Sequence, residues 1–128
     1  MHAVIETEGY LSDAKKAGVA EDELTHIASK IAQAPLTGDI IPGTGGARKL
    51  RFASPRKGKG KRGGYRVITY YAASDVPVFM LALINKGQRA DISQAERNAL
   101  RDELAEIEAD YRLGVRLKVK HLRGGRND

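Results

Sequence analysis

The run of residues 76–84 (VPVFMLALI) limits most narrowly what this chain can fold into, because nearly every residue in it is apolar. A strand with one face in water alternates apolar and polar residues, whereas a strand covered on both faces is a continuous apolar run. We therefore expect this segment to lie in the centre of a sheet. Pro77 cannot donate a ladder hydrogen bond, so the strand is expected to begin there.

Two helices are predicted before this run. Residues 2–6 (HAVIE) favour a short strand, and residues 8–17 favour a helix that Gly18 closes as a C-terminal cap. A second, amphipathic helix is predicted from Glu21 and ends before Pro35. Its apolar positions follow the helical repeat and are Leu24, Ile27, Ala28 and Ile31. Residues 36–46 (LTGDIIPGTGG) are predicted to be a turn-rich connector.

A basic hairpin is predicted between the second helix and the apolar strand. Residues 47–53 (ARKLRFA) alternate, so that Leu50 and Phe52 point to one face while Lys49 and Arg51 share the other. Residues 54–64 are predicted to form a loop rich in glycine, Lys and Arg. The β-branched and aromatic residues 65–71 (YRVITYY) then favour a strand.

A third helix is predicted after the apolar strand. Ser93 and Glu96 form a capping box, and an apolar stripe follows that should pack on the sheet or on the first helix: Leu100, Leu104, Ile107 and Tyr111. We expect one domain over residues 1–112 and an extended basic tail over 113–128. The element order implies an α+β fold: a small, mainly antiparallel sheet with two N-terminal helices and a C-terminal helix.

The charge distribution suggests a function. Residues 40–74 contain nine Lys or Arg and no Asp or Glu, whereas residues 1–39 and 75–111 are each net acidic. This segment presents a positive field unless the acidic helices fold over it, and the commonest polyanion for such a field is nucleic acid. A solvated basic face is the alternative. Cations held on rigid strands repel one another, however, and this cost is usually tolerated where an anion binds.

Several classes of function are excluded or disfavoured by the residues present. The chain has no Cys, and its three His (His2, His26 and His121) are far apart, so disulfides, thiolate catalysis and a zinc site are not expected. No apolar run reaches the length of a membrane span and no signal peptide is visible, so we expect a cytoplasmic protein. Residues 58–63 fit G-x-G-x-x-G, but a strand follows instead of the helix that a dinucleotide site requires.

Three segments stand out by their order and spacing: residues 43–51 (GTGGARKLR), residues 58–68 (GKGKRGGYRVI), and a strand ending in Lys86 followed by residues 91–93 (DIS). Taken together, these segments resemble the HigB-like branch of the RelE/ParE toxin superfamily. The similarity extends over residues 36–108. The tail after it has no counterpart in the family pattern.

This resemblance implies a RelE-like fold and the toxin of a type II toxin–antitoxin system. Such a toxin is a ribosome-dependent endoribonuclease that needs no cofactor, cuts mRNA in the decoding site and is silenced by a cognate antitoxin. In the family, basic residues on the second, third and fourth strands supply catalysis and phosphate binding. They correspond here to Lys49, Arg51, Arg66 and Lys86. Family members often add a tyrosine and an arginine afterwards, and residues 87–93 (GQRADIS) offer Arg89 but no tyrosine.

The residue types agree with a metal-free ribonuclease. Attack by the substrate's own 2′-hydroxyl needs a base, stabilisation of the charged phosphorane and an acid for the leaving 5′-oxygen. Arg51 and Arg66 suit the stabilising role, because guanidinium stays charged and grips phosphate with two N–H groups. Lys49 or Lys86 could be the base or the acid, because neighbouring cations lower the pKa of a lysine. Either these four cations suffice, or Tyr70 substitutes for the family tyrosine, or the activity is weak.

Other residues of the basic region are predicted to contact the nucleic acid: Arg48, Lys57, Lys59, Lys61, Arg62, Tyr70 and Arg89. Tyr65, Tyr70 and Tyr71 could stack on unpaired bases, although core packing is the commoner role for aromatic residues on a strand. Lys86 taken alone fits a strand end with a solvated tip. The alternative function is non-enzymatic, either a ParE-like toxin acting on gyrase or a basic RNA-binding module.

Overall fold

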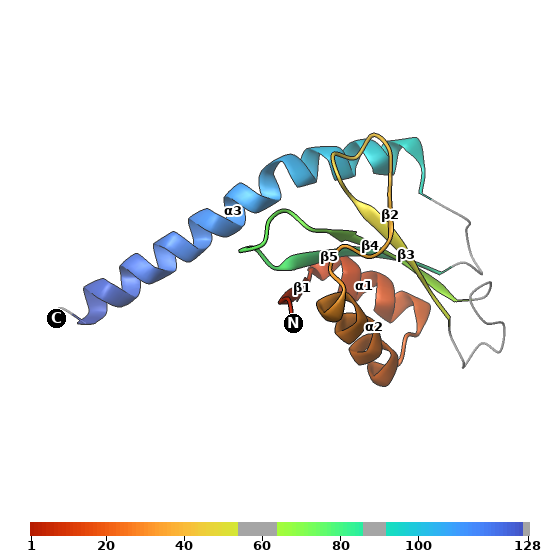
Figure 1. The fold of residues 1–128 in the computed structure, drawn as a ribbon, viewed down its shortest axis with the longest axis horizontal. Helices are drawn as coiled ribbons and strands as arrows, with labels where there is room; N and C mark the ends of the chain where they lie inside the picture. The colour runs from red at the N-terminus through yellow and green to blue at the C-terminus, as the bar shows by residue number, and fades with distance from the viewer. Residues whose placement is uncertain (54–63, 86–91, 127–128) are drawn as a thin grey trace.

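A computed structural model describes residues 1–53, 64–85 and 92–126 of the chain, with side chains described up to residue 115 (Figure 1). The elements are β1 (Val4–Glu6), α1 (Glu8–Ala17), α2 (Glu21–Gln33), β2 (Asp39–Ile40), β3 (Arg48–Phe52), β4 (Tyr65–Tyr70), β5 (Val78–Asn85) and α3 (Gln94–Arg126). The five strands form one sheet in the order β1-β5-β4-β3-β2. Only the β1–β5 pair is parallel. The predicted α+β class with a mainly antiparallel sheet is confirmed.

β5 is an interior strand covered on both faces, as its continuous apolar sequence predicts. It pairs with β1 on one side and β4 on the other, and begins at Val78, directly after Pro77. Helices α1 and α2 lie on one face of the sheet and α3 lies on the other (Figure 1). Six of the eight residues of β5 are buried.

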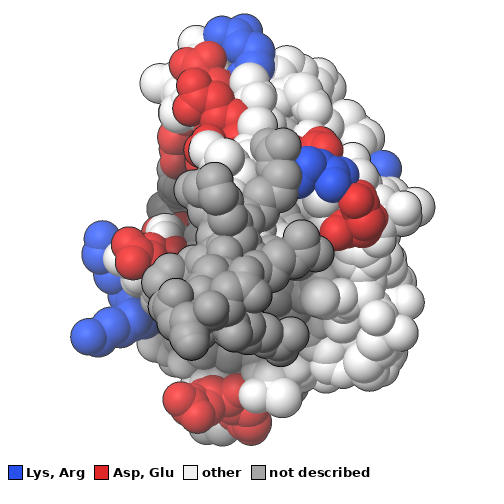
Figure 2. Space-filling model, turned by 90° about the vertical axis from the view of Figure 1, so that its left-hand side faces the viewer, with Lys and Arg blue, Asp and Glu red and all other residues white. Residues whose placement is uncertain are grey.

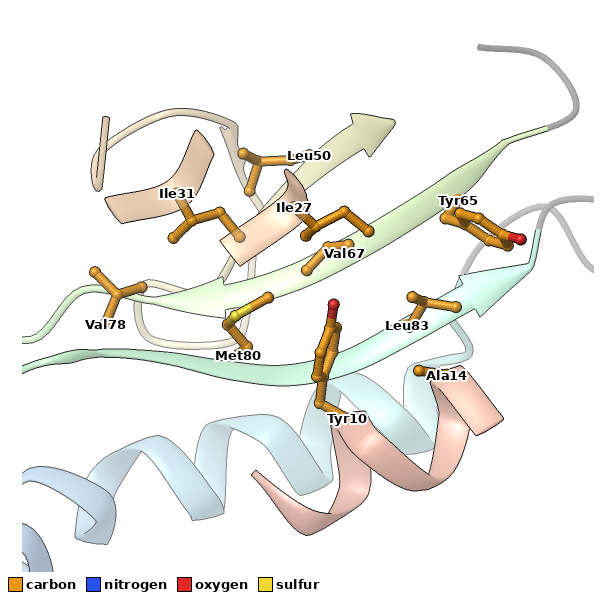
Figure 3. Packing of buried hydrophobic residues seen from close by; sticks show 10 residues of the cluster. All are labelled: Tyr10, Ala14, Ile27, Ile31, Leu50, Tyr65, Val67, Val78, Met80 and Leu83. Carbon is orange, nitrogen blue, oxygen red and sulfur yellow. The ribbon is translucent and has the colours of Figure 1, made fainter. Parts of the chain in front are cut away.

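One apolar cluster fills the space between the sheet and helices α1 and α2 (Figure 3). The buried members of this cluster are Tyr10, Ala14, Ile27, Ile31, Leu50, Tyr65, Val67, Val78, Met80 and Leu83. Tyr10 is the largest of its fully buried side chains, and burial together with the nearby Glu6 charge raises the pKa of its hydroxyl. The predicted apolar stripe of α2 is confirmed, because Ile27 and Ile31 face the sheet.

A second apolar cluster lies between the sheet and α3. The predicted stripe of α3 is part of it, so the helix packs on the sheet rather than on α1. Tyr111 makes an edge-to-face contact with Phe79 of β5 at a ring-centroid distance of 6.0 Å. The buried members of this cluster are Ile41, Ala47, Ile68, Val76, Phe79, Leu81, Ile84, Ile92, Leu100 and Leu104.

A β-bulge in β5 changes which face its later residues occupy. Ile68 of β4 pairs with Ala82, but Thr69 pairs with Met80, so Leu81 is an extra residue in β5. Side chains alternate along a regular strand, and one extra residue reverses the alternation beyond it. Leu83 therefore joins the α1/α2 cluster and Ile84 joins the α3 cluster.

Local signals predicted the helix ends correctly. Gly18 adopts a left-handed φ of 70° and its amide caps α1. At the start of α3, the Ser93 amide donates to Glu96 Oε1 at 2.9 Å and the Glu96 amide donates to Ser93 Oγ at 3.2 Å.

The predicted connector 36–46 contains a short strand, β2, in which Asp39 pairs with Lys49. That pairing depends on the edge of β3, so local sequence did not indicate it.

The expectation of an extended tail after residue 112 is wrong, because α3 continues without interruption to Arg126. The alternating apolar residues of 113–119 suggested extended backbone. A helix that has already formed gains one hydrogen bond for each residue it adds, and Leu, Arg and Lys favour this extension. The far half of α3 projects beyond the rest of the molecule (Figure 1).

An ion-pair network holds the middle of α3 to the β4–β5 turn. Arg112 Nη1 and Nη2 donate to the two carboxylate oxygens of Asp75, each at 2.7 Å, and Arg112 Nε donates to Glu108 Oε2 at 3.1 Å. The hydrogen bond from Arg112 holds the pKa of the Asp75 carboxyl below its usual value, while Asp75 and Glu108 raise the pKa of Arg112. All three groups are partly exposed, so salt will weaken the network.

Asp75→Asn should lower the free energy of unfolding near neutral pH and have a smaller effect in acid. A carboxyl whose pKa is lowered by folding stabilises the protein above its unfolded pKa of 3.8, and this contribution disappears as the pH falls through the folded pKa. The measurement is urea unfolding of wild type and variant between about pH 7 and pH 2.5, with Asp102→Asn, an exposed change on α3, as control. A wild-type-to-variant difference that is the same at every pH would contradict the ion-pair explanation.

Two glycine-to-alanine changes should affect stability in opposite directions. A Cβ at Gly64 would overlap the carbonyl oxygen of Phe52, so Gly64→Ala requires a backbone shift and should cost about 1–3 kcal/mol. A Cβ at Gly114 would meet nothing within 4 Å, and Ala is preferred to Gly within a helix by about 0.5–1 kcal/mol. Chemical denaturation of wild type and of both variants measures the free energies of unfolding that test this prediction. A stable Gly64→Ala protein would show that β3 and β4 do not approach as closely as described.

Candidate functional site

The two hairpin strands place three predicted site residues on one face of the sheet. Arg51 of β3 lies directly opposite Arg66 of β4, and Lys49 lies opposite Ile68. Ile68 belongs to the apolar cluster under α3, whereas Leu50 belongs to the cluster under α1 and α2. Because side chains alternate along a strand, Lys49, Arg51 and Arg66 lie on the α3 face. The face that Lys49 and Arg51 were predicted to share is confirmed.

These three cations differ in their exposure. Arg66 is only 4% exposed and pairs on its other side with Ile84 of β5, so it lies in the interior of the sheet. Arg51 is exposed and Lys49 is half-buried. Like charges directly opposite each other on neighbouring strands are destabilising, and Arg51 and Arg66 hold this position. The strand pairing thus holds two guanidinium groups on one face, one in the interior of the sheet and the other in solvent.

A cavity of about 910 Å³ lies between α2 and β3. Its apolar lining residues from β3 face α2, so the cavity lies on the sheet face opposite to the cations of β3 and β4. Lys49 and Arg51 border it along β3, and Asp22, Glu23 and Asp39 line it from α2 and β2. The acidic second helix therefore lies along β3 on the face opposite to the cation site.

His26, for which the sequence indicates no role, also lines this cavity. Its ring contacts Phe52 edge to face at a centroid distance of 6.4 Å. His26 is thus brought to the same edge of β3 as Lys49 and Arg51 by the packing of α2 on the sheet. No local spacing along the sequence could have indicated this.

Arg48 and Tyr70, which were predicted to bind nucleic acid, have structural contacts. Arg48 Nη1 donates to the carbonyl oxygens of Leu36 and Gly38, at 3.1 and 3.2 Å, and so holds the connector against β3. Tyr70 is half-buried and packs against the α3 cluster, and a Cβ at Gly46 would touch its ring at 3.4 Å. Their roles in binding stay predictions.

Tyr65 and Tyr71 pack in the core, which is the alternative role considered for them. Tyr65 is 3% exposed and belongs to the α1/α2 cluster. Tyr71 packs against the same cluster and lies against the His2 ring at a centroid distance of 5.3 Å. His2 Nε2 in turn lies 2.7 Å from the carbonyl oxygen of Val76, so this histidine joins two segments of the fold.

Part of the predicted site lies outside the residues that the structure describes. These residues are Lys57, Lys59, Lys61, Arg62, Lys86 and Arg89. The predicted loop of residues 54–64 is described only at Gly64. The roles of these residues therefore stay predictions from sequence.

One further cation faces the sheet and was not singled out from the sequence. Arg97 of α3 is half-buried, and its Nε atom is buried without a hydrogen-bond partner. The signal that could have identified it is its spacing, because it precedes Leu100 by three residues and Leu104 by seven. It therefore continues the buried stripe of α3 toward the helix start.

Figure 2 shows the side of the molecule toward which α3 projects, and among the side chains that the structure describes there, acidic and basic ones are interspersed. Arg51 and Arg66 lie toward the other end of the sheet, where β4 begins and β5 ends.

Within residues 1–53, 64–85 and 92–126, no group of three or more His, Asp or Glu side chains is placed to hold a metal ion. Among the helices that the structure describes, none is both long and apolar enough to cross a membrane.

The fold and the site define a class of small α+β proteins in which the face of an antiparallel sheet carries a cluster of cations next to a C-terminal helix. Residues 3–115 match the family model described as the RelE toxin of the RelE/RelB toxin–antitoxin system. The chain belongs to this family and is the toxin of a toxin–antitoxin system. The predicted resemblance to the RelE/ParE superfamily is confirmed, while the HigB-like branch stays a prediction.

Among solved structures, the chain is similar to a mutant of the E. coli toxin RelE in the free state. The sequence identity is 16% and the TM-score is 0.49, with 70% of this chain and 86% of that chain covered.

Proposed function

We propose that this toxin is an endoribonuclease that cleaves mRNA on the ribosome by attack of the substrate's own 2′-hydroxyl group. The observation that carries the proposal is the pair Arg51 and Arg66, opposite each other on the α3 face of the sheet in a member of the RelE toxin family. Two guanidinium groups held by strand pairing are suited to a phosphate that gains negative charge in the transition state.

The two arginines have distinct roles in this proposal. Arg51 is exposed and makes the first contact with the RNA backbone. Arg66 lies in the interior, where electrostatic interactions are less screened by water, and stabilises the phosphorane. Because both residues belong to strands in one ladder, their backbone positions are fixed before the substrate binds.

Proton transfer is assigned to lysine. Lys49 lies two residues from Arg51 on the same strand face, beside the position proposed for the scissile phosphate, and an amine there is able to take or give a proton. Lys86, which follows β5 directly, is the other candidate. One of them takes the 2′-hydroxyl proton and the other protonates the leaving 5′-oxygen.

The proposed partners are mRNA with ribosomal RNA, and an antitoxin. Membership of the RelE family implies an antitoxin partner. We propose that the antitoxin neutralises the cations of the α3 face, because complementary charge stabilises association and would block access of RNA. The basic segment 40–74, including the cations beyond the described residues, would supply most of the nonspecific affinity for RNA.

Arg66→Lys should reduce RNA cleavage about 10²- to 10³-fold while the protein stays folded. Lysine keeps the charge and most of the volume of this buried side chain but loses the paired N–H groups that grip phosphate. Cleavage of mRNA on purified translating ribosomes measures the effect, and thermal unfolding verifies the fold. Arg101→Lys, an exposed change on α3, is the matched control. Cleavage by the Arg66 variant at the wild-type rate would refute the role assigned to Arg66.

The products should carry 2′,3′-cyclic phosphate or 3′-phosphate ends, because the 2′-hydroxyl is the nucleophile. A substrate with a single 2′-deoxy nucleotide at the scissile position should bind but remain uncut. End-group analysis and cleavage of the substituted RNA test the mechanism. Products with a 3′-hydroxyl end would rule it out. A protein that binds the RNA without cutting any substrate would favour the non-enzymatic alternative.

A further inference from the structure

Arg97 occupies an unusual position on α3. It lies on the stripe that packs against the sheet, three residues before the buried Leu100. Its Nε atom is buried and has no hydrogen-bond partner. Burying an N–H group without a partner is unfavourable, and a long basic side chain on a helix can usually avoid this by extending into water. In the structure, the Nε donor of Arg97 stays buried and without an acceptor.

The packing of α3 places Arg97 near the end of the sheet that holds the proposed site. Tyr111 contacts Phe79, and these two residues align the helix with β5. At about 1.5 Å per residue, Arg97 lies about 21 Å back along α3 from Tyr111. At about 3.3 Å per residue, Ile84 lies about 17 Å along β5 from Phe79. Because α3 begins near the end of the sheet at which β5 ends (Figure 1), these lengths place Arg97 and Ile84 toward the same end of the molecule.

The strand register connects this position to the two proposed phosphate ligands. Ile84 pairs with Arg66, and Arg66 pairs with Arg51, all on the α3 face. Figure 1 shows α3 beginning above this same end of the sheet. Arg97, on the helix, therefore faces the same side of the sheet as Arg51 and Arg66. The residue before Arg97 is Glu96. Its carboxylate accepts a hydrogen bond from the Ser93 amide at 2.9 Å and so forms part of the capping box of α3.

We propose, resting on the nuclease assignment for the identity of the ligand, that Arg97 is an additional binding residue for a phosphate group of the RNA. A phosphate accepts two hydrogen bonds from one guanidinium, through Nε and one terminal nitrogen, and so satisfies the buried Nε donor. The site then has one ligand on each of three elements: β3, β4 and α3. The helix that covers the sheet also completes its anion site.

Binding of inorganic phosphate tests Arg97 without requiring nuclease activity. Thermal unfolding of the purified protein is followed in increasing phosphate and in sodium chloride of equal ionic strength. Phosphate should raise the unfolding temperature of wild type and of the control Arg101→Met. It should raise that of Arg97→Met by less than half as much, because a ligand stabilises only a folded state that binds it. Without phosphate, Arg97→Met should be at least as stable as wild type, because methionine buries no unsatisfied donor.

Arg97→Lys distinguishes binding from packing. A lysine keeps the positive charge but cannot make the paired contact, so the phosphate effect should lie between those of wild type and Arg97→Met. In the RNA assay, Arg97→Met should raise KM at least tenfold. Equal phosphate effects in wild type and Arg97→Met, or no phosphate effect in wild type, would overturn the proposal.

The two proposals can fail separately. A phosphate effect that depends on Arg97, in a protein that cuts no RNA, would support the anion site and refute the nuclease. Normal KM in Arg97→Met, in a protein that cuts RNA, would support the nuclease and refute the role of Arg97.

Discussion

The need to cover β5 on both faces determines the arrangement of the rest of the structure. Its apolar run cannot form an edge or a solvent-facing strand without exposing large side chains to water. Helices α1 and α2 cover one face and α3 covers the other, and β1 and β4 occupy its two edges. Each element therefore has a position defined relative to this strand. The face beneath α3 is also the face on which the cations of β3 and β4 lie.

The β-bulge connects this packing to the proposed site. Because Leu81 is an extra residue, the side chains of β5 on either side of it still point alternately into the α1/α2 cluster and the α3 cluster. Beyond the bulge, Ile84 lies on the α3 face and pairs with Arg66, so a buried cation has an apolar residue on one side and Arg51 on the other. A buried, positively charged position of this kind interacts strongly with a phosphate, because little water screens it.

The electrostatics of the site depend on charges that are distant in the sequence. The acidic residues Asp22 and Glu23 of α2 line the cavity beside β3, on the sheet face opposite to the cations of the site. On the α3 face, strand pairing places Arg51 opposite Arg66. Like charges opposite each other on neighbouring strands repel, and binding of an anion between them would reduce this repulsion. The same repulsion would favour association with an antitoxin that supplies negative charge.

The sequence by itself determined those features that depend on neighbouring residues. The ends of α1 and α3 followed from Gly18 and from the Ser93–Glu96 capping box, and the shared face of Lys49 and Arg51 followed from strand alternation. Only the tertiary structure decided the pairing of β2, the bulge in β5 and the burial of Arg66. It also decided that the start of α3, which carries Arg97, lies toward the end of the sheet at which β5 ends, because the helix packs along the sheet. These features arise between segments that are far apart along the chain, so no local pattern of residues encodes them.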